Sequence, residues 1–452
     1  MISPDFPFSP ARLPFFYGWF IVFVSTVGTI LSIPGQTMGV SVFTDFLIRD
    51  LGISRNELSS AYMGGTIASA CCLPVAGYLF DRLGARSMIV VSSLALAGTL
   101  LFLSSCERIA SVASRELSTV FSSSTVSFAV LCVGFFSLRF WGQGVLTMVS
   151  RAMLGKWFDR RRGFAAALSG VFVSAAFALA PVVLLARISS RGWRGAWVEL
   201  ATVCAAWALV GGIFYRDNPE ECGLEMDGGP RPRDAAVSPA LIVHEFTLVE
   251  ALKTYSFWVA SLSLSLFGLV ITGLTFHITS IGAKHGLLDS ESVAIFVPMA
   301  AVSVASNFVI GWLSDRIRIR NLFWVLLGAQ AIGSGALLSF GTPSGRVLVA
   351  IGFGVAGGVF ALLTTVIWPR FYGRAHLGAI SGISMALTVF GSALGPKIFA
   401  LAESRDGRYD ASFLFGVISA LVLMVASVGI DNPQRSAAAP TPTAEPGRRD
   451  ER

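Results

Sequence analysis

Long apolar runs alternate with short polar stretches along this chain of 452 residues. A run of about twenty apolar residues is long enough for an α-helix to cross the hydrocarbon core of a bilayer. Twelve such runs can be marked, and a polar stretch at 216–254 divides them into two sets of six. We therefore predict an all-α membrane protein with transmembrane helices at 16–46, 56–80, 86–105, 125–151, 162–187, 193–215, 255–282, 290–314, 320–341, 345–370, 376–402 and 409–430.

The polar stretches define the remaining organisation of the chain. Residues 1–15 form a short N-terminal segment, and the prolines, glycines and charges of 216–254 indicate a linker. The tail at 431–452 consists mainly of Ala, Pro, Thr and charged residues, a composition that predicts disorder. The expected domains are thus two six-helix bundles, at 16–215 and 255–430, joined by the linker.

Composition supports a membrane protein. With 54% hydrophobic and 13% charged residues, the chain has more apolar surface than soluble domains of this size bury. The net charge of +7 could indicate a nucleic-acid partner, but the basic residues stand singly between apolar runs, which fits membrane topology better. The six cysteines show no paired or metal-ligand spacing. We expect no nucleic acid, no metal and no cofactor.

The distribution of Lys and Arg predicts the orientation. If both termini are cytoplasmic, 21 of the 34 basic residues, Arg151 among them, fall on the cytoplasmic side, 12 fall on the other side and one lies inside a span. Cytoplasmic loops retain positive charge, so the opposite orientation is rejected. We expect an integral plasma-membrane protein, which for a bacterial chain means the inner membrane, with both termini cytoplasmic.

A charged turn lies between the second and third runs, with the sequence Gly77-Tyr78-Leu79-Phe80-Asp81-Arg82-Leu83-Gly84-Ala85-Arg86, and it returns in weaker form from Gly311 to Arg320. The pattern Gly-x-x-x-Asp-Arg-x-Gly-x-Arg resembles the signature loop of the major facilitator superfamily of membrane transporters. The resemblance covers about residues 15–430. It implies the major facilitator fold, two pseudosymmetric six-helix bundles with the substrate site between them at the midplane.

The spacing of the repeats indicates an insertion. The offset between the halves is 211 residues from Trp157 to Trp368 but 234 from Gly77 to Gly311. The first half therefore carries extra residues between its third and fourth spans, and 106–124 is the candidate, an outward loop of unknown role.

Short motifs narrow the resemblance to the monocarboxylate transporter and oxalate/formate antiporter branch. They are Phe16-Tyr17-Gly18-Trp19, Trp157-Phe158-x-x-x-Arg162-Gly163 and Thr275-Phe276-His277. Members of that branch hold their substrates with cations on spans eight and eleven or on spans one and eight. Here Asn307 and Thr388 stand at the matching places of spans eight and eleven, and span one has no cation, so neither mechanism transfers.

The charged turns predict a gate. Asp81 should face the start of span eleven near 375–378, and Asp315 the start of span five near Arg162, where helix N-termini present unpaired N–H groups. These contacts would lock the inner side closed in the outward-facing state. The alternative is that the charges only anchor topology. The residues assigned to the gate are Asp81, Arg82, Arg86, Asp315 and Arg316.

Arg139 lies near the middle of span four, where a guanidinium is costly and must face a cavity or a partner. No Asp or Glu lies at a comparable depth. Two interpretations stay open. Arg139 either binds an anionic substrate by charge-assisted hydrogen bonds, or it holds the broken first helix by bonding to span-one carbonyls or to Gln36.

The remaining site candidates are polar residues of the spans. Pro34 and Gly35 loosen span one, and free carbonyls are tolerated only beside protein or a water-lined cavity. Symmetry between the halves adds cavity candidates from spans seven and ten, including Thr272 and Thr364. His277 could titrate, or it could be an interfacial histidine whose hydrogen bonds are satisfied. The candidate substrate residues are Arg139, Gln36, Thr37, Gln143, Thr275, His277, Asn307, Thr365 and Thr388.

These observations predict a secondary active or facilitative transporter, not an enzyme, since no Walker loop or nucleophile constellation is present. The expected solute is a small organic anion of the monocarboxylate type, with or without a co-transported ion or proton. The lack of a midplane carboxylate favours uniport or exchange over proton symport. The alternatives are an exporter of amphipathic compounds and a solute sensor that does not transport. The expected state is a monomer in the lipid bilayer.

Overall fold

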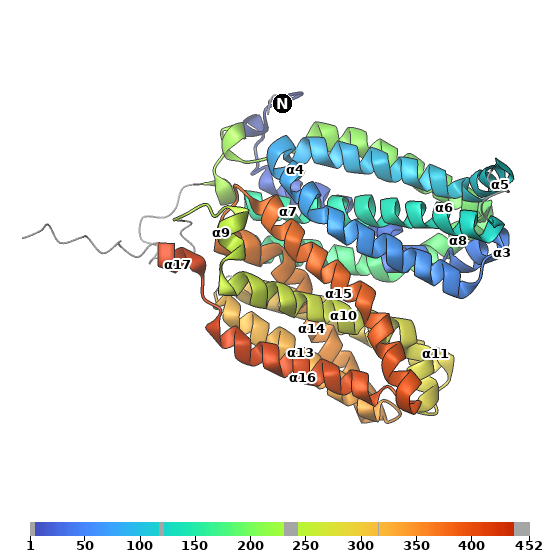
Figure 1. Ribbon diagram of the computed structural model, residues 1–452. Helices are drawn as coiled ribbons and strands as arrows, with labels where there is room; N and C mark the ends of the chain where they lie inside the picture. The colour runs from blue at the N-terminus through green and yellow to red at the C-terminus, as the bar shows by residue number, and fades with distance from the viewer. Residues whose placement is uncertain (1–4, 117–121, 230–242, 315, 438–452) are drawn as a thin grey trace, which may run out of the picture.

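The computed structural model describes residues 5–116, 122–229, 243–314 and 316–437. Within these ranges every regular element is a helix, and the helices form two bundles that lie side by side (Figure 1). The predicted gate residue Asp315 falls outside the described residues.

The first bundle contains α1 (Gly18–Ile30), α2 (Thr37–Ser41), α3 (Thr44–Leu51), α4 (Arg55–Ser104), α5 (Cys106–Glu116), α6 (Ser123–Leu138), α7 (Thr147–Trp157) and α8 (Arg162–Phe214). After α9 (Leu248–Leu252), the second bundle contains α10 (Tyr255–Lys284), α11 (Asp289–Ala294), α12 (Phe296–Ser314), α13 (Ile319–Ala336), α14 (Pro343–Tyr372), α15 (Leu377–Asp406) and α16 (Asp410–Ala426). The short α17 (Pro433–Ala437) follows it. We call the two bundles the N-half and the C-half.

Ten helical stretches of the described chain are long and apolar enough to cross a membrane. Two of them, of 49 and 53 residues, are much longer than one crossing needs. Each leaves helical geometry at a glycine in the left-handed region, Gly84 at φ 80° and Gly192 at φ 71°, which a glycine adopts without steric cost. Counting two crossings in each gives twelve, so the predicted twelve-helix fold is confirmed.

Three local features interrupt or extend the predicted spans; the first follows from Pro34 and Gly35, and the other two differ from the expected pattern. Span one is interrupted by a 3-10 turn at Ile33–Gly35, because Pro34 cannot donate a helical hydrogen bond. In the predicted insertion, residues Cys106–Glu116 form a helix, α5, rather than a loop, and residues 117–121 lie outside the description. The tail begins with α17, because Gln434 donates to the carbonyls of His244 and Phe371; residues 438–452 lie outside the description.

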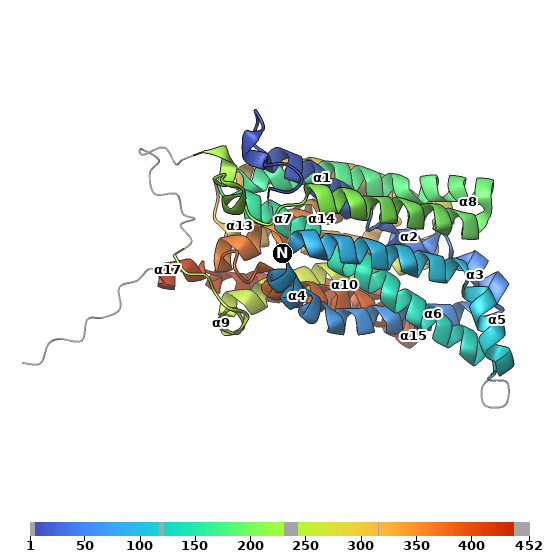
Figure 2. The ribbon, with the colours of Figure 1, turned by 90° about the horizontal axis from the view of Figure 1, so that it is seen from above.

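The two ends of the molecule carry different elements. The N-terminal residues, α9 and α17 lie at one end, which we call the terminal end, and α3, α5 and α11 lie at the other, the distal end (Figures 1 and 2). The halves touch through α4 with α15 and through α8 with α12. Gly77 and Gly378 approach so closely near the terminal end that a Cβ on either would overlap the other's carbonyl oxygen. The halves are therefore in close backbone contact near the terminal end.

Candidate functional site

Asp81 joins the two halves at the terminal end. Its carboxylate on α4 accepts hydrogen bonds from the backbone N–H groups of Gly378, at 2.6 Å, and Ala379, at 2.7 Å. These N–H groups open α15, where a helix has unpaired donors and the positive end of its dipole. Asp81 thus contacts the helix start that the sequence predicts, and the contact crosses from the N-half to the C-half. Its role as a gate remains a prediction.

Carboxylates of the linker cap three other chain segments at this end. Asp227 accepts from the backbone N–H groups that precede α8, at 3.2 Å from Asp159 and 2.8 Å from Arg160. Asp217 accepts from Ala85 N–H, and Glu245 from Arg374 N–H at 2.6 Å. The linker was predicted only by composition, which gives no sign of these partners. The helix start that was expected to face Asp315 is therefore contacted by Asp227.

Arg374 adds a second tie between the halves. Its Nη1 donates to the Lys156 carbonyl of the N-half at 2.8 Å, and its Nη2 forms an ion pair with Glu220 of the linker at 2.8 Å. Together with Asp81, these contacts join the two halves at the terminal end.

The arginines of the predicted gate make contacts inside their own halves. Arg86 is buried and donates to the carbonyls of Tyr215 and Phe6, both at 3.0 Å, which fastens the N-terminal segment to the N-half. Arg82 is exposed beside Tyr78, and Arg316 lies 3.9 Å from the centre of the Trp312 ring. Near Arg86, burial raises the pKa of the Cys222 thiol to about 11, so this cysteine stays protonated at neutral pH and packs as an apolar residue.

Arg139 connects span four to the interruption of span one. It is 2% exposed, its Nη1 donates to the Gly35 carbonyl at 3.0 Å, and its guanidinium lies 5.2 Å from the centre of the Tyr62 ring. Thr37 Oγ1 is 3.5 Å from the same Nη1 and 3.0 Å from the Tyr62 hydroxyl. Of the two interpretations, these contacts favour a residue that holds the broken first helix.

The same junction contains Gln36 and Gln143. Gln36 Nε2 donates to Ser32 Oγ at 3.0 Å and lies 3.4 Å from Thr147 Oγ1, while Gln143 Oε1 is buried without a partner among the described residues. Span four is π-helical at Arg139–Leu146, a wider turn that is frequent at functional sites. One cluster within the N-half therefore contains Gln36, Thr37, Arg139 and Gln143. The sequence analysis named all four as candidates but proposed only the contact of Arg139 with span one.

Gly35→Ala is expected to destabilise this junction. A Cβ at Gly35 would lie 2.5 Å from the Leu138 carbonyl oxygen and 2.7 Å from Gln143 N, both backbone atoms of span four. Such overpacking costs about 2 kcal/mol, so the melting temperature in detergent should fall by several degrees. Gly64→Ala is the matched control, because nothing lies within 4 Å of a Cβ there. Equal melting temperatures for the two variants would contradict the close junction.

The candidates of spans seven, ten and eleven lie within the C-half. His277 has a partner at each ring nitrogen, the Pro396 carbonyl at 3.0 Å and the Tyr409 hydroxyl at 3.2 Å. Thr275, Thr365 and Thr388 donate to carbonyls of their own helices, and Thr272 pairs with Ser392 at 2.7 Å. Helix α10 is continuous, so the interruption of span one has no counterpart in span seven. Pseudosymmetry therefore predicts the helices of the C-half, but it does not predict the local geometry of span seven.

Asn307 lies where α12 of the C-half meets α8 of the N-half. Its Nδ2 donates to the Gly358 carbonyl at 3.1 Å. Its Oδ1 is buried without a partner among the described residues and faces Gly170, where a Cβ would come within 2.5 Å of it. Asn307 is thus the candidate that most clearly contacts the opposite half.

Arg151 contacts the opposite half. The sequence counts it among the cytoplasmic residues, which stays a prediction, and it lies inside α7, six residues before that helix ends at Trp157. Its Nη1 donates to Thr364 Oγ1 of α14, in the other half, at 3.2 Å. The π-helical segment before α7 changes the angular position of every later residue, which a helical period read from the sequence does not anticipate.

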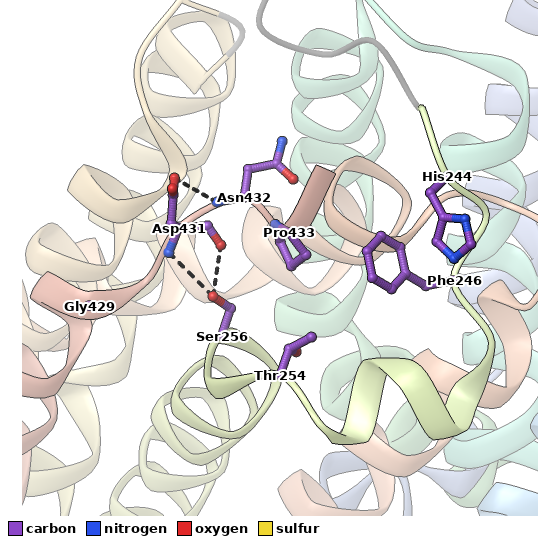
Figure 3. A pocket seen from close by; sticks show the side chains of 8 residues that line it. All are labelled: His244, Phe246, Thr254, Ser256, Gly429, Asp431, Asn432 and Pro433. Atoms are coloured by element: carbon purple, nitrogen blue, oxygen red, sulfur yellow. Dashed lines mark hydrogen bonds between the residues drawn. The ribbon is translucent and has the colours of Figure 1, made fainter. Parts of the chain in front are cut away.

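A surface pocket of about 510 Å³ opens at the terminal end between the linker and the C-half (Figure 3). Its lining includes His244, Thr254 and Asp431, and Ser256 Oγ donates to the Asp431 carbonyl at 2.7 Å. None of the substrate candidates lines this pocket. It is therefore distinct from the contact region between the halves.

A family model described as the Major Facilitator Superfamily matches residues 19–396. The chain is 22% identical over 408 residues to a probable sulfoacetate transporter of Cupriavidus necator, covering 83% of this chain and 85% of that protein. It is 25% identical over 398 residues to monocarboxylate transporter 11 of Mus musculus, covering 83% and 81%. Among solved structures it resembles the fucose:proton symporter of E. coli, with a TM-score of 0.62, 12% identity and coverage of 91% and 98%.

Proposed function

The chain belongs to the Major Facilitator Superfamily of integral membrane transporters, and on this premise we propose that it carries a small organic monoanion by alternating access between its two halves. The coarser statement, a membrane transporter of small organic or anionic solutes, follows from the family and the relatives. The monoanion and the mechanism are our proposal.

The observation that carries the mechanism is the Asp81 contact with α15. It joins the halves at the terminal end through two charge-assisted hydrogen bonds, which are stronger than bonds between neutral groups. A contact that can be made and broken at one end is what alternating access requires. We take the structure to be the state in which the terminal end is closed.

The charge pattern inside the spans supports an anion. Arg139 lies in the middle of the helical stretch 123–157, whereas the described carboxylates of the spans, such as Glu57, Glu199 and Glu403, lie toward the helix ends. Excess positive charge in the membrane interior favours an anionic solute. The names of the two relatives, a sulfoacetate and a monocarboxylate transporter, agree with this class.

Orientation and coupling are further parts of the proposal. The excess of Lys and Arg in segments at the terminal end supports placing that end in the cytoplasm. Both nitrogens of His277 have partners, and no described carboxylate lies at the depth of Arg139, which supports uniport or exchange over proton symport.

Flux into liposomes tests the proposal. Purified protein should give saturable uptake of labelled acetate or lactate, because the charge pattern favours small organic monoanions. Protein-free liposomes are the control, and tetraphenylphosphonium and ethidium test the exporter alternative. Uptake of the cationic amphiphiles without uptake of any anion would support the exporter. Binding of an anion without flux would support the sensor.

A further inference from the structure

Arg151 places a guanidinium between the two halves. Its helix, α7, belongs to the N-half, and its hydrogen-bond partner Thr364 belongs to α14 of the C-half. One helical turn closer to the terminal end, Gly155 of α7 packs against Pro369 of α14. Arg151 therefore lies between the halves, on the distal side of the contact of Gly155 with Pro369.

The charge of Arg151 has no carboxylate partner among the described residues. Thr364 Oγ1 is its one hydrogen-bond partner there, and no described carboxylate forms an ion pair with it. Nε of Arg139 and Nε of Arg216 are fully buried without a partner, but no nitrogen of Arg151 is enclosed in this way, and the residue is partly exposed. Its remaining N–H groups thus reach accessible space.

An unneutralised guanidinium inside a membrane protein is costly, and such residues usually mark the path of a solute or ion. The planar guanidinium offers parallel N–H donors that match the two oxygens of a carboxylate or sulfonate. Arg139 is less suitable than Arg151 for binding such an anion, because its Nη1 is hydrogen-bonded to the Gly35 carbonyl and its Nε is enclosed.

We propose that Arg151, oriented by Thr364, binds the anionic headgroup of the transported solute, a carboxylate or a sulfonate with a single negative charge. This inference rests on the proposed function and assigns the binding residue to it. One unpaired cation neutralises one charge, so a dianion would retain an uncompensated charge at this site. Because Thr364 belongs to the other half, the binding residue is held in place by both halves.

Arg151→Gln should raise the KM for uptake of the anions named above by about a hundredfold, since the charge and the paired donors are lost. Arg151→Lys should raise it by about tenfold, because the charge remains without the planar fork. Thr364→Ser should leave KM unchanged and Thr364→Val should raise it several-fold. The melting temperatures of all four variants should stay within a few degrees of the wild type.

Lys397→Gln serves as the comparison, because Lys397 is an exposed cation of α15. It should leave KM unchanged. An unchanged KM in Arg151→Gln, a fall in Vmax alone, or a raised KM in Lys397→Gln instead would overturn the inference. Wild-type protein that carries none of the anions would show that the proposed function itself has failed, before any variant is compared.

Discussion

Asp81→Asn is expected to lower the initial rate of anion uptake by at least about tenfold in a protein that still folds. The asparagine keeps the shape of the side chain but loses the charge, and its amide NH₂ faces an N–H donor of Gly378 or Ala379. Charge-assisted hydrogen bonds contribute about 1.5–3 kcal/mol each, so the closed terminal end loses about 3 kcal/mol or more relative to the open one. That is roughly a hundredfold change in the ratio of molecules with a closed terminal end to molecules with an open one.

Tracer uptake into liposomes, with membrane insertion and melting temperature measured in parallel, checks this expectation. Asp410→Asn is the matched control, because Asp410 pairs with Arg408 in its own half at the other end of the C-half. Uptake at the wild-type rate in Asp81→Asn would show that the contact only anchors topology.

Arg139→Gln is expected to lower the melting temperature clearly and to abolish uptake as a consequence. The buried guanidinium bridges the Gly35 carbonyl and the Tyr62 ring, and a glutamine is too short to satisfy both. Leaving a buried carbonyl and its neighbours unpaired costs about 2–4 kcal/mol. Tyr62→Phe is the control and should lower the melting temperature less, since it keeps the ring beside the guanidinium and removes only the hydroxyl that is hydrogen-bonded to Thr37.

Thermal unfolding in detergent, with and without added lactate, separates the two interpretations of Arg139. A structural Arg139 gives a lower melting temperature in both conditions. If Arg139→Gln keeps the wild-type melting temperature but loses the increase that the anion causes, Arg139 would be identified as a residue that binds the anion. That result would weaken the assignment of Arg151.

The sequence predicts the parts of the fold that depend on hydropathy and on local backbone chemistry. The twelve crossings follow from apolar run lengths, and Gly84 and Gly192 mark the reversals inside the two longest helices. The contact of Asp81 with the start of α15 follows from the repeat of the Asp-Arg turn, because the same pattern at two places implies a symmetric partner.

The site was less predictable, because side-chain partners depend on packing between distant segments. Asp227 and Glu245 cap helix and loop N–H groups from within a linker that has no periodic pattern. Arg151 stands at a predicted helix end, and only the π-helical segment and the full length of α7 bring it to Thr364. The inserted 106–124 segment was located by counting, but its helical form was not predicted.

The distance between the halves at the terminal end is the most direct test of alternating access in this protein. Spin labels can be placed at Arg160 in the N-half and Arg318 in the C-half, both exposed, after replacement of the six native cysteines. Double electron–electron resonance in liposomes should then give one short distance without solute and an added longer distance when acetate or lactate is present. In Asp81→Asn, the longer distance should appear without solute. A single distance that neither the anions nor the Asp81 substitution changes would contradict the account.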